Sequence, residues 1–177
     1  MIDAKSTVPP PLRDLILIGG GHSHVQVIKR IYMRQIPGVR VTLISEDYDS
    51  AYSGMLPGCV AGIYTKEQIS IQLSALCSIA NVRFICAKVT GLDVNAKQIS
   101  LRGRSPVRYD TLSINAGGSP GMNRSIGINV KPINLFLPRW QAASGEIGTQ
   151  KGKRRTLCIV GAGAGGVELA FVMRAGL

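Results

Sequence analysis

Apolar runs separated by turn residues divide the chain into short strands and helices. Residues 15–18 and 39–44 are largely apolar, and residues 111–116 carry Leu112, Ile114 and Ala116, which predicts strands buried in a sheet. Residues 25–32 carry apolar side chains at helical spacing, and a Pro-Gly pair at residues 37–38 ends that pattern. Because strand, helix and strand alternate, the pattern predicts an α/β domain with a parallel sheet.

Weaker patterns fill the middle of the chain. A helix is predicted over residues 69–79, with Asn81 as its C-terminal stop. Short alternating runs over residues 82–109 predict a strand followed by a small antiparallel meander. Residues 52–58 are rich in turn formers and carry no charge, so they predict a loop.

Glycine-rich turns follow two apolar runs. The string GGGHSH (residues 19–24) follows the first run, and GAGAGG (residues 161–166) follows a predicted strand at residues 157–160. A strand that turns on glycines into a helix is the context of a dinucleotide-binding fingerprint, because the helix start offers amides and a positive dipole end to a pyrophosphate. Two such turns predict a protein that binds two dinucleotides.

The two turns differ at their third glycine position. Gly161, Gly163 and Gly166 match the fingerprint, whereas His24 occupies the position where the first turn should have glycine or alanine. Either the first helix lies further from its strand and the histidine meets the ligand, or the first turn is not a dinucleotide site. The chain downstream favours the former.

An acidic residue is expected about 20 positions after the glycines, at the end of the second strand, to hold ribose hydroxyls. Glu46 lies there and is our candidate. The alternative is that Glu46, Asp47 and Asp49 form a solvated loop.

Four features in order resemble flavoproteins with two dinucleotide-binding domains, the pyridine nucleotide-disulfide oxidoreductase superfamily. They are the first glycine turn, the acid after the second strand, a Tyr-Asp-x-Leu…Gly-x-Pro segment at residues 109–120, and the second glycine turn. The resemblance implies a Rossmann-like FAD-binding domain, with a parallel sheet, helices and a small antiparallel meander, and the start of a Rossmann-like NAD(P)-binding domain. We expect a disordered lead at residues 1–13, the FAD-binding domain at 14–125, a connecting segment at 126–154 and a truncated NAD(P)-binding domain at 155–177.

The resemblance implies FAD and NAD(P)H as cofactors and assigns residues to them. For the FAD pyrophosphate these are Gly19, Gly21, His22, Ser23 and His24, and for the ribose Glu46. Near the flavin they are Gly54, Met55, Leu56 and Pro57, and along the cofactor Ala116, Gly117 and Gly118. Those implied for NAD(P)H are Gly161, Gly163, Gly166 and Glu168. Glu168 is equally explained as a favourable charge in the first turn of a helix. Gly117 departs from the common Ala-Thr-Gly, which removes a hydroxyl and leaves the backbone geometry available.

A narrower resemblance is carried by GGGHSH, by YSGMLPG at residues 52–58 and by residues 130–140. These segments are similar to a branch related to type II NADH dehydrogenases that is often fused to a selenide, water dikinase domain, which implies such a domain as a fused or separate partner. In the superfamily the nicotinamide half continues beyond the second turn. We therefore expect this chain to be a fragment that is inactive by itself, because a lone strand–turn–helix cannot bury its apolar face.

Composition narrows the possible classes of protein. The chain is 45% hydrophobic with a mean hydropathy of +0.18, and no apolar run approaches the roughly 20 residues that span a bilayer. We expect a cytoplasmic protein without a transmembrane segment. The net charge of +11 raises nucleic-acid or membrane binding as an alternative. However, Lys and Arg are scattered except at residues 151–155, which we interpret as a solvated connection, so we expect no nucleic-acid partner.

The cysteines and histidines offer little chemistry of their own. The four cysteines contain no C-x-x-C pair, which argues against a zinc site and against dithiol chemistry. Cys59 is the one redox candidate, because by resemblance it follows the flavin-facing segment; single cysteines are usually inert. His22 and His24 have no third ligand nearby, so no metal is expected.

The primary hypothesis is an FAD-dependent oxidoreductase that takes hydride from NAD(P)H and passes electrons to an unidentified acceptor, with a quinone or a selenium or sulfur species as candidates. Its catalytic residues are unknown, since the flavin carries the chemistry. The alternative is a non-catalytic flavin-binding or regulatory module attached to a selenophosphate synthetase.

Overall fold

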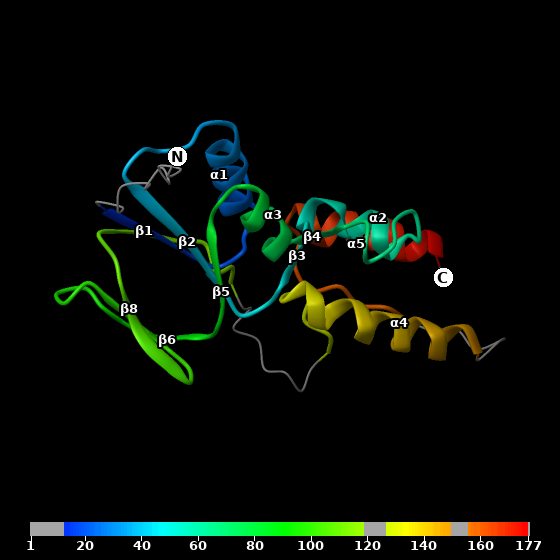
Figure 1. Cartoon of the computed structure of the whole chain (residues 1–177). Coiled ribbons are helices and arrows are strands. Elements are labelled where there is room, and N and C mark those ends of the chain that lie inside the picture. Colours follow the sequence, from blue (N-terminus) through cyan, green and yellow to red (C-terminus); the bar gives the residue numbers. More distant parts are fainter. Residues whose placement is uncertain (1–12, 119–126, 150–155, 177) are drawn as a thin grey trace, which may run out of the picture. The chain divides into compact units, whose positions relative to one another are not determined.

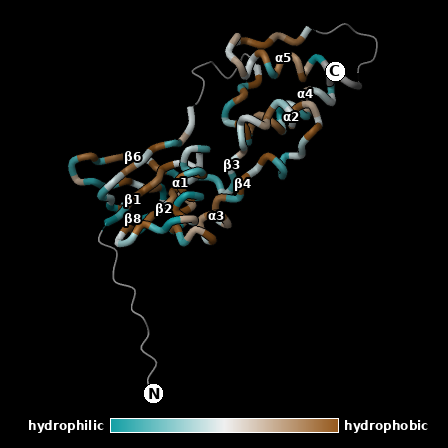
Figure 2. Tube along the Cα trace, turned by 90° about the horizontal axis from the view of Figure 1, so that it is seen from above, coloured by the Kyte–Doolittle hydropathy of each residue, from teal (hydrophilic) through white to brown (hydrophobic). Residues whose placement is uncertain are grey.

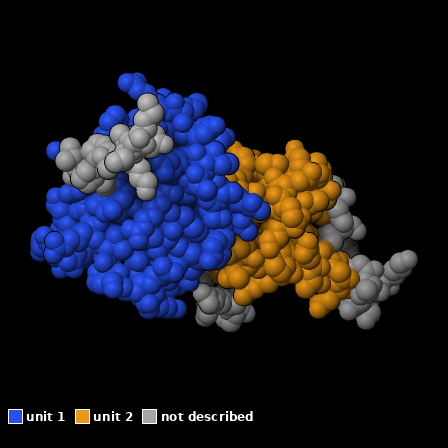
Figure 3. Space-filling view, in the orientation of Figure 1, with its two compact units in different colours: residues 1–50, 72–116 blue, residues 51–71, 117–177 orange. Residues whose placement is uncertain are grey.

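The computed structural model describes residues 13–118, 127–149 and 156–176, which form two compact units (Figure 3). Unit 1 consists of Met1–Ser50 and Gln72–Ala116, and unit 2 consists of Ala51–Ile71 and Gly117–Leu177. The expected domain boundaries at residues 13, 125 and 154 stay a prediction. Residues 1–12 of the predicted lead, the proline of the Gly-x-Pro segment at residue 120 and the basic cluster at residues 151–155 lie outside the described residues.

A four-stranded parallel sheet forms the centre of unit 1 (Figure 1). Its order is β5 (Arg83–Cys86), β2 (Val39–Ser45), β1 (Arg13–Ile18) and β9 (Thr111–Ile114). Helix α1 (His22–Met33) connects β1 to β2, and α3 (Leu73–Ile79) precedes β5. The chain leaves β1 toward β2 and later returns to the other edge of β1 as β9, so β1 and β9 form a topological switch point, where open α/β sheets bind ligands.

An antiparallel meander packs against one face of this sheet. It consists of β6 (Val89–Asp93), β7 (Gln98–Leu101) and β8 (Arg104–Arg108). The shared cluster contains Ile16, Ile18, Ile44, Ile85, Ile99 and Leu101. Because side chains alternate along a strand, Leu17 and Leu43 point to the opposite face, where α1 and α3 supply buried apolar residues. The sheet therefore has apolar side chains on both faces, and Figure 2 shows the hydropathy of each residue along the trace.

Unit 2 is mainly helical within the described residues. It contains a 3₁₀ turn at Ser53–Met55, α2 (Leu56–Val60), α4 (Ile133–Thr149) and α5 (Ala164–Gly176). Its buried cluster draws on all three α-helices: Leu56, Ile69, Phe136, Leu137, Trp140, Leu169 and Met173. The chain passes between the units at a two-stranded sheet of β3 (Asp49–Ala51) and β4 (Ser70–Gln72). No helix of the described residues is long and apolar enough to cross a bilayer.

The predicted fold class is confirmed, but three local predictions are wrong. Residues 53–60 are helical and not a loop, because the fixed φ of Pro57 suits a first helical turn and Leu56 is buried. The predicted helix over residues 69–79 begins only at Leu73, because residues 70–72 pair with β3. Residues 157–160 make no strand pairing among the described residues, since no described strand lies beside them to share hydrogen bonds.

Helix α4 was not predicted, because its sequence contains Pro138 and two glycines. Its helical state is instead stabilised by burial, since Phe136, Leu137 and Trp140 are 2%, 3% and 8% exposed. Part of the expected connecting segment is thus a helix of 17 residues that contributes to the core of unit 2.

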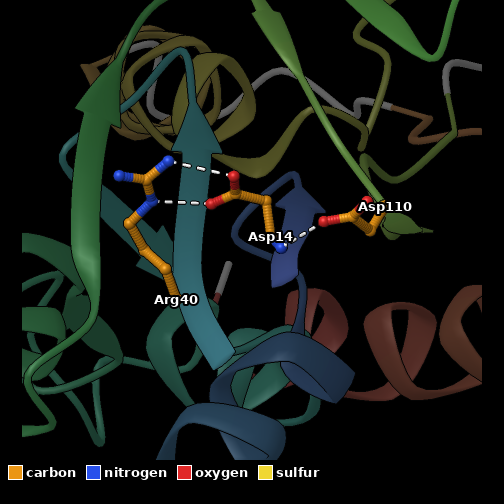
Figure 4. Close-up of polar contacts among 3 residues, drawn as sticks. All are labelled: Asp14, Arg40 and Asp110. Carbon is orange, nitrogen blue, oxygen red and sulfur yellow. Dashed lines mark hydrogen bonds and ion pairs between the residues drawn. The ribbon is translucent and has the colours of Figure 1, made fainter. Parts of the chain in front are cut away.

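A polar network ties the amino ends of three strands in unit 1 (Figure 4). Arg40 on β2 donates to both carboxylate oxygens of Asp14 on β1, at 2.6 and 2.9 Å. The backbone amide of Asp14 donates to the carboxylate of Asp110 at 2.6 Å, and the Asp110 amide donates to the Asp14 carbonyl at 2.9 Å. The Asp14 carboxylate raises the pKa of Arg40. The network extends the pairing of β1 with β9 by one residue, from Leu15 and Thr111 to Asp14 and Asp110.

We expect Asp110→Ala to lower the free energy of unfolding by about 1 kcal/mol, because it leaves a strand amide without its acceptor. Arg40→Met should cost less, about 0.5 kcal/mol, because the Arg40–Asp14 pair is solvent-exposed. Urea denaturation of both variants measures the difference. A larger loss in Arg40→Met than in Asp110→Ala would contradict this ranking.

Cys77 of α3 is fully buried in unit 1, and burial raises the pKa of its thiol from 9.0 to about 11. In the unfolded chain the thiol ionises near its ordinary value. Its contribution to stability is therefore complete below pH 9 and is lost as the pH rises toward 11. We expect the unfolding free energy of the wild type to fall more steeply between these values than that of Cys77→Ala. Parallel pH profiles of the two proteins would show that Cys77 does not titrate as a buried thiol.

Candidate dinucleotide-binding site

Three backbone hydrogen bonds hold the first glycine turn at the switch point of unit 1. The Gly19 amide donates to the Ile44 carbonyl at 2.7 Å, and the Asn115 amide donates to the Ile18 carbonyl at 2.7 Å. The Gly21 amide then donates to the Asn115 carbonyl at 3.2 Å. The turn is therefore fixed by the carboxyl ends of β2 and β9, on both sides of β1.

The backbone of this turn leaves no space for side chains. Gly19 has a φ of +91°, and a Cβ atom there would lie within 3 Å of the backbone of Asn115 and Ala116. A Cβ atom at Gly21 would lie 2.5 Å from the side-chain amide of Asn115. Gly19 also needs the left-handed conformation that favours glycine. Gly19 is thus required by its conformation and by the backbone beside it, and Gly21 packs closely against the side chain of Asn115.

Helix α1 begins without a side-chain cap. Gly21 is its N-cap, and its first turn contains no acidic residue. The first bond of the helical ladder runs from the Val25 amide to the Gly21 carbonyl at 3.2 Å. Amides before that point have no acceptor within the helix, so a helix start of this kind can bind an anion. The side chains of His22 and Ser23 are exposed here.

His24 is 2% exposed and lies between the turn and β9. Its Nδ1 is 2.7 Å from the carbonyl oxygen of Gly19, and its Nε2 is 2.9 Å from the hydroxyl of Ser113. Both ring nitrogens therefore have partners within unit 1. A contact between His24 and a cofactor stays a prediction.

Glu46 follows β2 at the same carboxyl edge of the sheet. Its carboxylate is exposed and accepts from Lys88 Nζ, 3.1 Å from each oxygen. Its main-chain carbonyl accepts a weak bond from the Cys86 thiol at 3.4 Å. The predicted ribose ligand thus lies where the fingerprint requires it, in an exposed ion pair with Lys88, a residue the sequence pattern did not single out.

The segment after β9 is partly described. Ala116 follows Asn115 beside Gly19 and is exposed. Gly117 has a φ of +76°, and open space surrounds the positions that Cβ atoms would take at Gly117 and Gly118. This segment can therefore approach a ligand closely, as its predicted role requires.

Unit 2 contains a pocket of about 250 Å³ that brings together residues predicted for the two cofactors. Leu56 and Pro57 come from the predicted flavin-facing segment, and Gly166 and Glu168 come from the second glycine turn and α5. Ser53 and Lys131 add polar groups to the lining. The remaining lining residues are apolar or glycine: Val130, Ile133, Ile159, Gly165 and Leu169. Gly54, Met55, Gly161 and Gly163 do not line it.

The second glycine turn is also closely packed. Gly161 has a φ of +118°, and a Cβ atom at Gly166 would collide with the carbonyl oxygen of Gly161. The Gly166 amide donates to the Gly163 carbonyl at 2.9 Å. Glycine at position 166 is therefore required by the start of α5, as the fingerprint predicts.

The thiols near these sites are poorly suited to redox chemistry. Burial, together with the Glu67 carboxylate, raises the pKa of Cys59, so its reactive thiolate is scarce at neutral pH. Among the described cysteines none forms a disulfide. Within the same residues, no group of three or more His, Cys, Asp or Glu side chains is arranged to hold a metal ion.

Known proteins resemble this chain over between about three-fifths and nine-tenths of its length. The NADH dehydrogenase-like protein YutJ of Bacillus subtilis (strain 168) is 27% identical over 173 residues, which cover 92% of this chain and 45% of that protein. Sulfide-quinone reductase of Aquifex aeolicus (strain VF5) is 26% identical over 105 residues, covering 59% of this chain and 24% of that protein. The water-forming NADH oxidase from Lactobacillus brevis, bound to NADH, has a similar fold, with a TM-score of 0.64 and 20% identity over 90% of this chain and 37% of that one.

The chain thus spans less than half the length of these relatives. The sequence model of the pyridine nucleotide-disulphide oxidoreductases matches residues 13–176. Because the match includes both glycine turns and the whole parallel sheet, the chain belongs to the pyridine nucleotide-disulphide oxidoreductase family.

Proposed function

We propose that this chain is the FAD-binding part, with the start of the NAD(P)H-binding part, of an oxidoreductase that takes hydride from NAD(P)H and passes the electrons to a separate acceptor. The observation that carries the proposal is the glycine turn at the switch point, where Gly19 and Gly21 leave no space for side chains. A pyrophosphate bound there would meet backbone amides and the positive end of the α1 dipole, both of which favour an anion.

The proposed FAD contacts follow the carboxyl edge of the sheet. Residues 19–24 would hold the pyrophosphate, with the side chains of His22 and Ser23 exposed beside it. Glu46 would accept hydrogen bonds from ribose hydroxyls after exchanging its ion pair with Lys88, a modest cost for an exposed pair. Residues 116–118 would follow the cofactor, since their surroundings are open. Residues 54–57 would lie near the flavin.

NAD(P)H is proposed to bind at the second turn, through Gly161, Gly163, Gly166 and the start of α5. The mostly apolar pocket beside Gly166 suits a flat aromatic ring, and Glu168 adds an acceptor for a carboxamide or hydroxyl group. Bound FAD supplies the hydride acceptor, while the protein binds and orients both cofactors and limits access of water.

The acceptor is proposed to be a quinone or a selenium or sulfur species. The relative named sulfide-quinone reductase supports the quinone class, and the NADH dehydrogenase-like relative supports a nicotinamide donor. The link to a selenide, water dikinase domain, and with it the non-catalytic alternative, rests on the sequence motifs alone. Extending the chain toward the length of its relatives would test whether NADH reduces bound FAD.

We expect the purified chain to bind FAD, giving a flavin absorption spectrum and quenched flavin fluorescence. Gly19→Ala should weaken FAD binding by tenfold or more, because its Cβ atom forces the turn away from β9. Gly103→Ala is the matched control: its φ of +67° imposes similar strain, but open space surrounds it in the β7–β8 turn. Equal loss of FAD affinity in both variants would indicate general destabilisation and not a cofactor site.

Glu46→Gln should weaken FAD binding by about tenfold, because hydrogen bonds to a charged group contribute roughly 1.5–3 kcal/mol. Asp47→Asn, one residue further along the same exposed segment, should keep the affinity within about twofold. Fluorescence titration of both variants with FAD measures this. If Asp47→Asn lost affinity and Glu46→Gln did not, the ribose ligand would be misassigned.

A further inference from the structure

His24 makes two hydrogen bonds that determine its tautomer. The carbonyl oxygen of Gly19 can only accept, so Nδ1, at 2.7 Å, carries the proton. In the neutral ring Nε2 is then an acceptor, and the hydroxyl of Ser113 at 2.9 Å donates to it. Both polar atoms of a side chain that is 2% exposed are thus satisfied by the turn and by β9.

The bond to Gly19 also determines the direction of the next amide. A peptide unit is planar and trans, so the carbonyl of Gly19 and the amide of Gly20 point in opposite directions. Since the carbonyl points to the buried imidazole, the Gly20 amide points away from the imidazole. His24 therefore controls an amide that belongs to a different residue.

This amide differs from those of its glycine neighbours. The Gly19 and Gly21 amides donate to the carbonyls of Ile44 and Asn115. Within the described part of the chain the Gly20 amide has no such acceptor. It is therefore the amide of the three glycines that is available to a ligand, and a buried amide without a partner would be costly.

We propose that His24 is a positioning residue of the dinucleotide site: by donating a hydrogen bond from Nδ1 to the Gly19 carbonyl it holds that carbonyl inward, and so points the Gly20 amide at the pyrophosphate. This role rests on the proposed function for its ligand. It explains why a large side chain occupies the third glycine position, since the imidazole replaces close helix–strand packing with a hydrogen bond to the turn.

Two substitutions of similar size separate positioning from packing. In His24→Asn the side-chain amide nitrogen occupies the place of Nδ1 and can still donate to Gly19, whereas His24→Leu fills the site without a donor. We expect His24→Asn to keep the FAD dissociation constant within about threefold, and His24→Leu to raise it about tenfold, the effect of one lost hydrogen bond. A packing role would give the opposite order, because leucine is the better apolar filler of a buried site.

A second readout needs no flavin. In ¹H–¹⁵N spectra of the free 177-residue chain, His24→Leu should shift the Gly20 amide resonance and change its hydrogen-exchange rate, while the wild type should show a proton on Nδ1 of His24. Ile28→Ala is the control, because Ile28 is a fully buried residue of the same helix whose aliphatic side chain cannot form a hydrogen bond with the Gly19 carbonyl. The Gly20 amide resonance should stay unchanged in this variant.

The outcomes distinguish the two proposals. An unchanged Gly20 amide in His24→Leu, or equal FAD affinity in the asparagine and leucine variants, would overturn the positioning role. If the Gly20 amide changes in His24→Leu but the wild-type chain binds no FAD, His24 would remain the residue that orients the turn. The flavin site itself would then be overturned.

Discussion

The first glycine turn depends on one constraint: three strand ends meet there with no space for a side chain between them. The Gly19 amide is bonded to the end of β2, and the Gly21 amide is bonded to the chain leaving β9. A Cβ atom at Gly19 would collide with the backbone of Asn115 and Ala116 directly after β9, and one at Gly21 would collide with the side chain of Asn115. The order of the sheet, the start of α1 and the position of Glu46 at the sheet edge all follow from keeping these ends together.

The two glycine turns have similar backbone geometry but different residues against the carbonyl of their first glycine. In both, the first glycine has a positive φ and its carbonyl faces the residue five positions later. At the second turn that residue is Gly166, and the carbonyl of Gly161 packs directly against its Cα region. At the first turn it is His24, whose imidazole donates to the carbonyl of Gly19. A mismatch to a sequence fingerprint can therefore preserve the backbone geometry that the fingerprint describes.

The sequence predicted the parts of the fold that local pattern determines. Apolar runs located β1, β2 and β9, alternation located the meander, and Asn81 does adopt the left-handed conformation, with a φ of 54°. The errors occur where distant contacts override local preference. Pro138 and glycines argue against α4, yet Phe136 and Trp140 are buried against residues from α2 and α5. Similarly, β4 forms because Ile69 bonds to Tyr52, at 2.8 Å, a contact that no local pattern contains.

For the site, the fingerprint located both glycine turns and the acid after β2, because the spacing of a strand, a turn and a helix is set by backbone geometry. It did not reveal that Lys88 is paired with Glu46, nor that Ser113 is bonded to His24. Those partners come from β9 and from the loop after β5, far along the chain. Nor did any pattern indicate that Val130, Lys131 and Ile133 line the same pocket as Gly166.

The chain leaves unit 1 at β3 and returns to it at β4, so unit 2 is built from two segments that are synthesised at different times. Every strand of the parallel sheet in unit 1 lies before residue 117, so that unit can fold before the C-terminal part of unit 2 is made. The core of unit 2 joins Leu56 to Met173, which leaves α2 exposed until the distant helix is made. Contacts of such sequence separation form slowly, and exposed apolar surface invites aggregation. Residues 51–71 thus contain the core side chains of unit 2 that are separated farthest in sequence from their packing partners on α5.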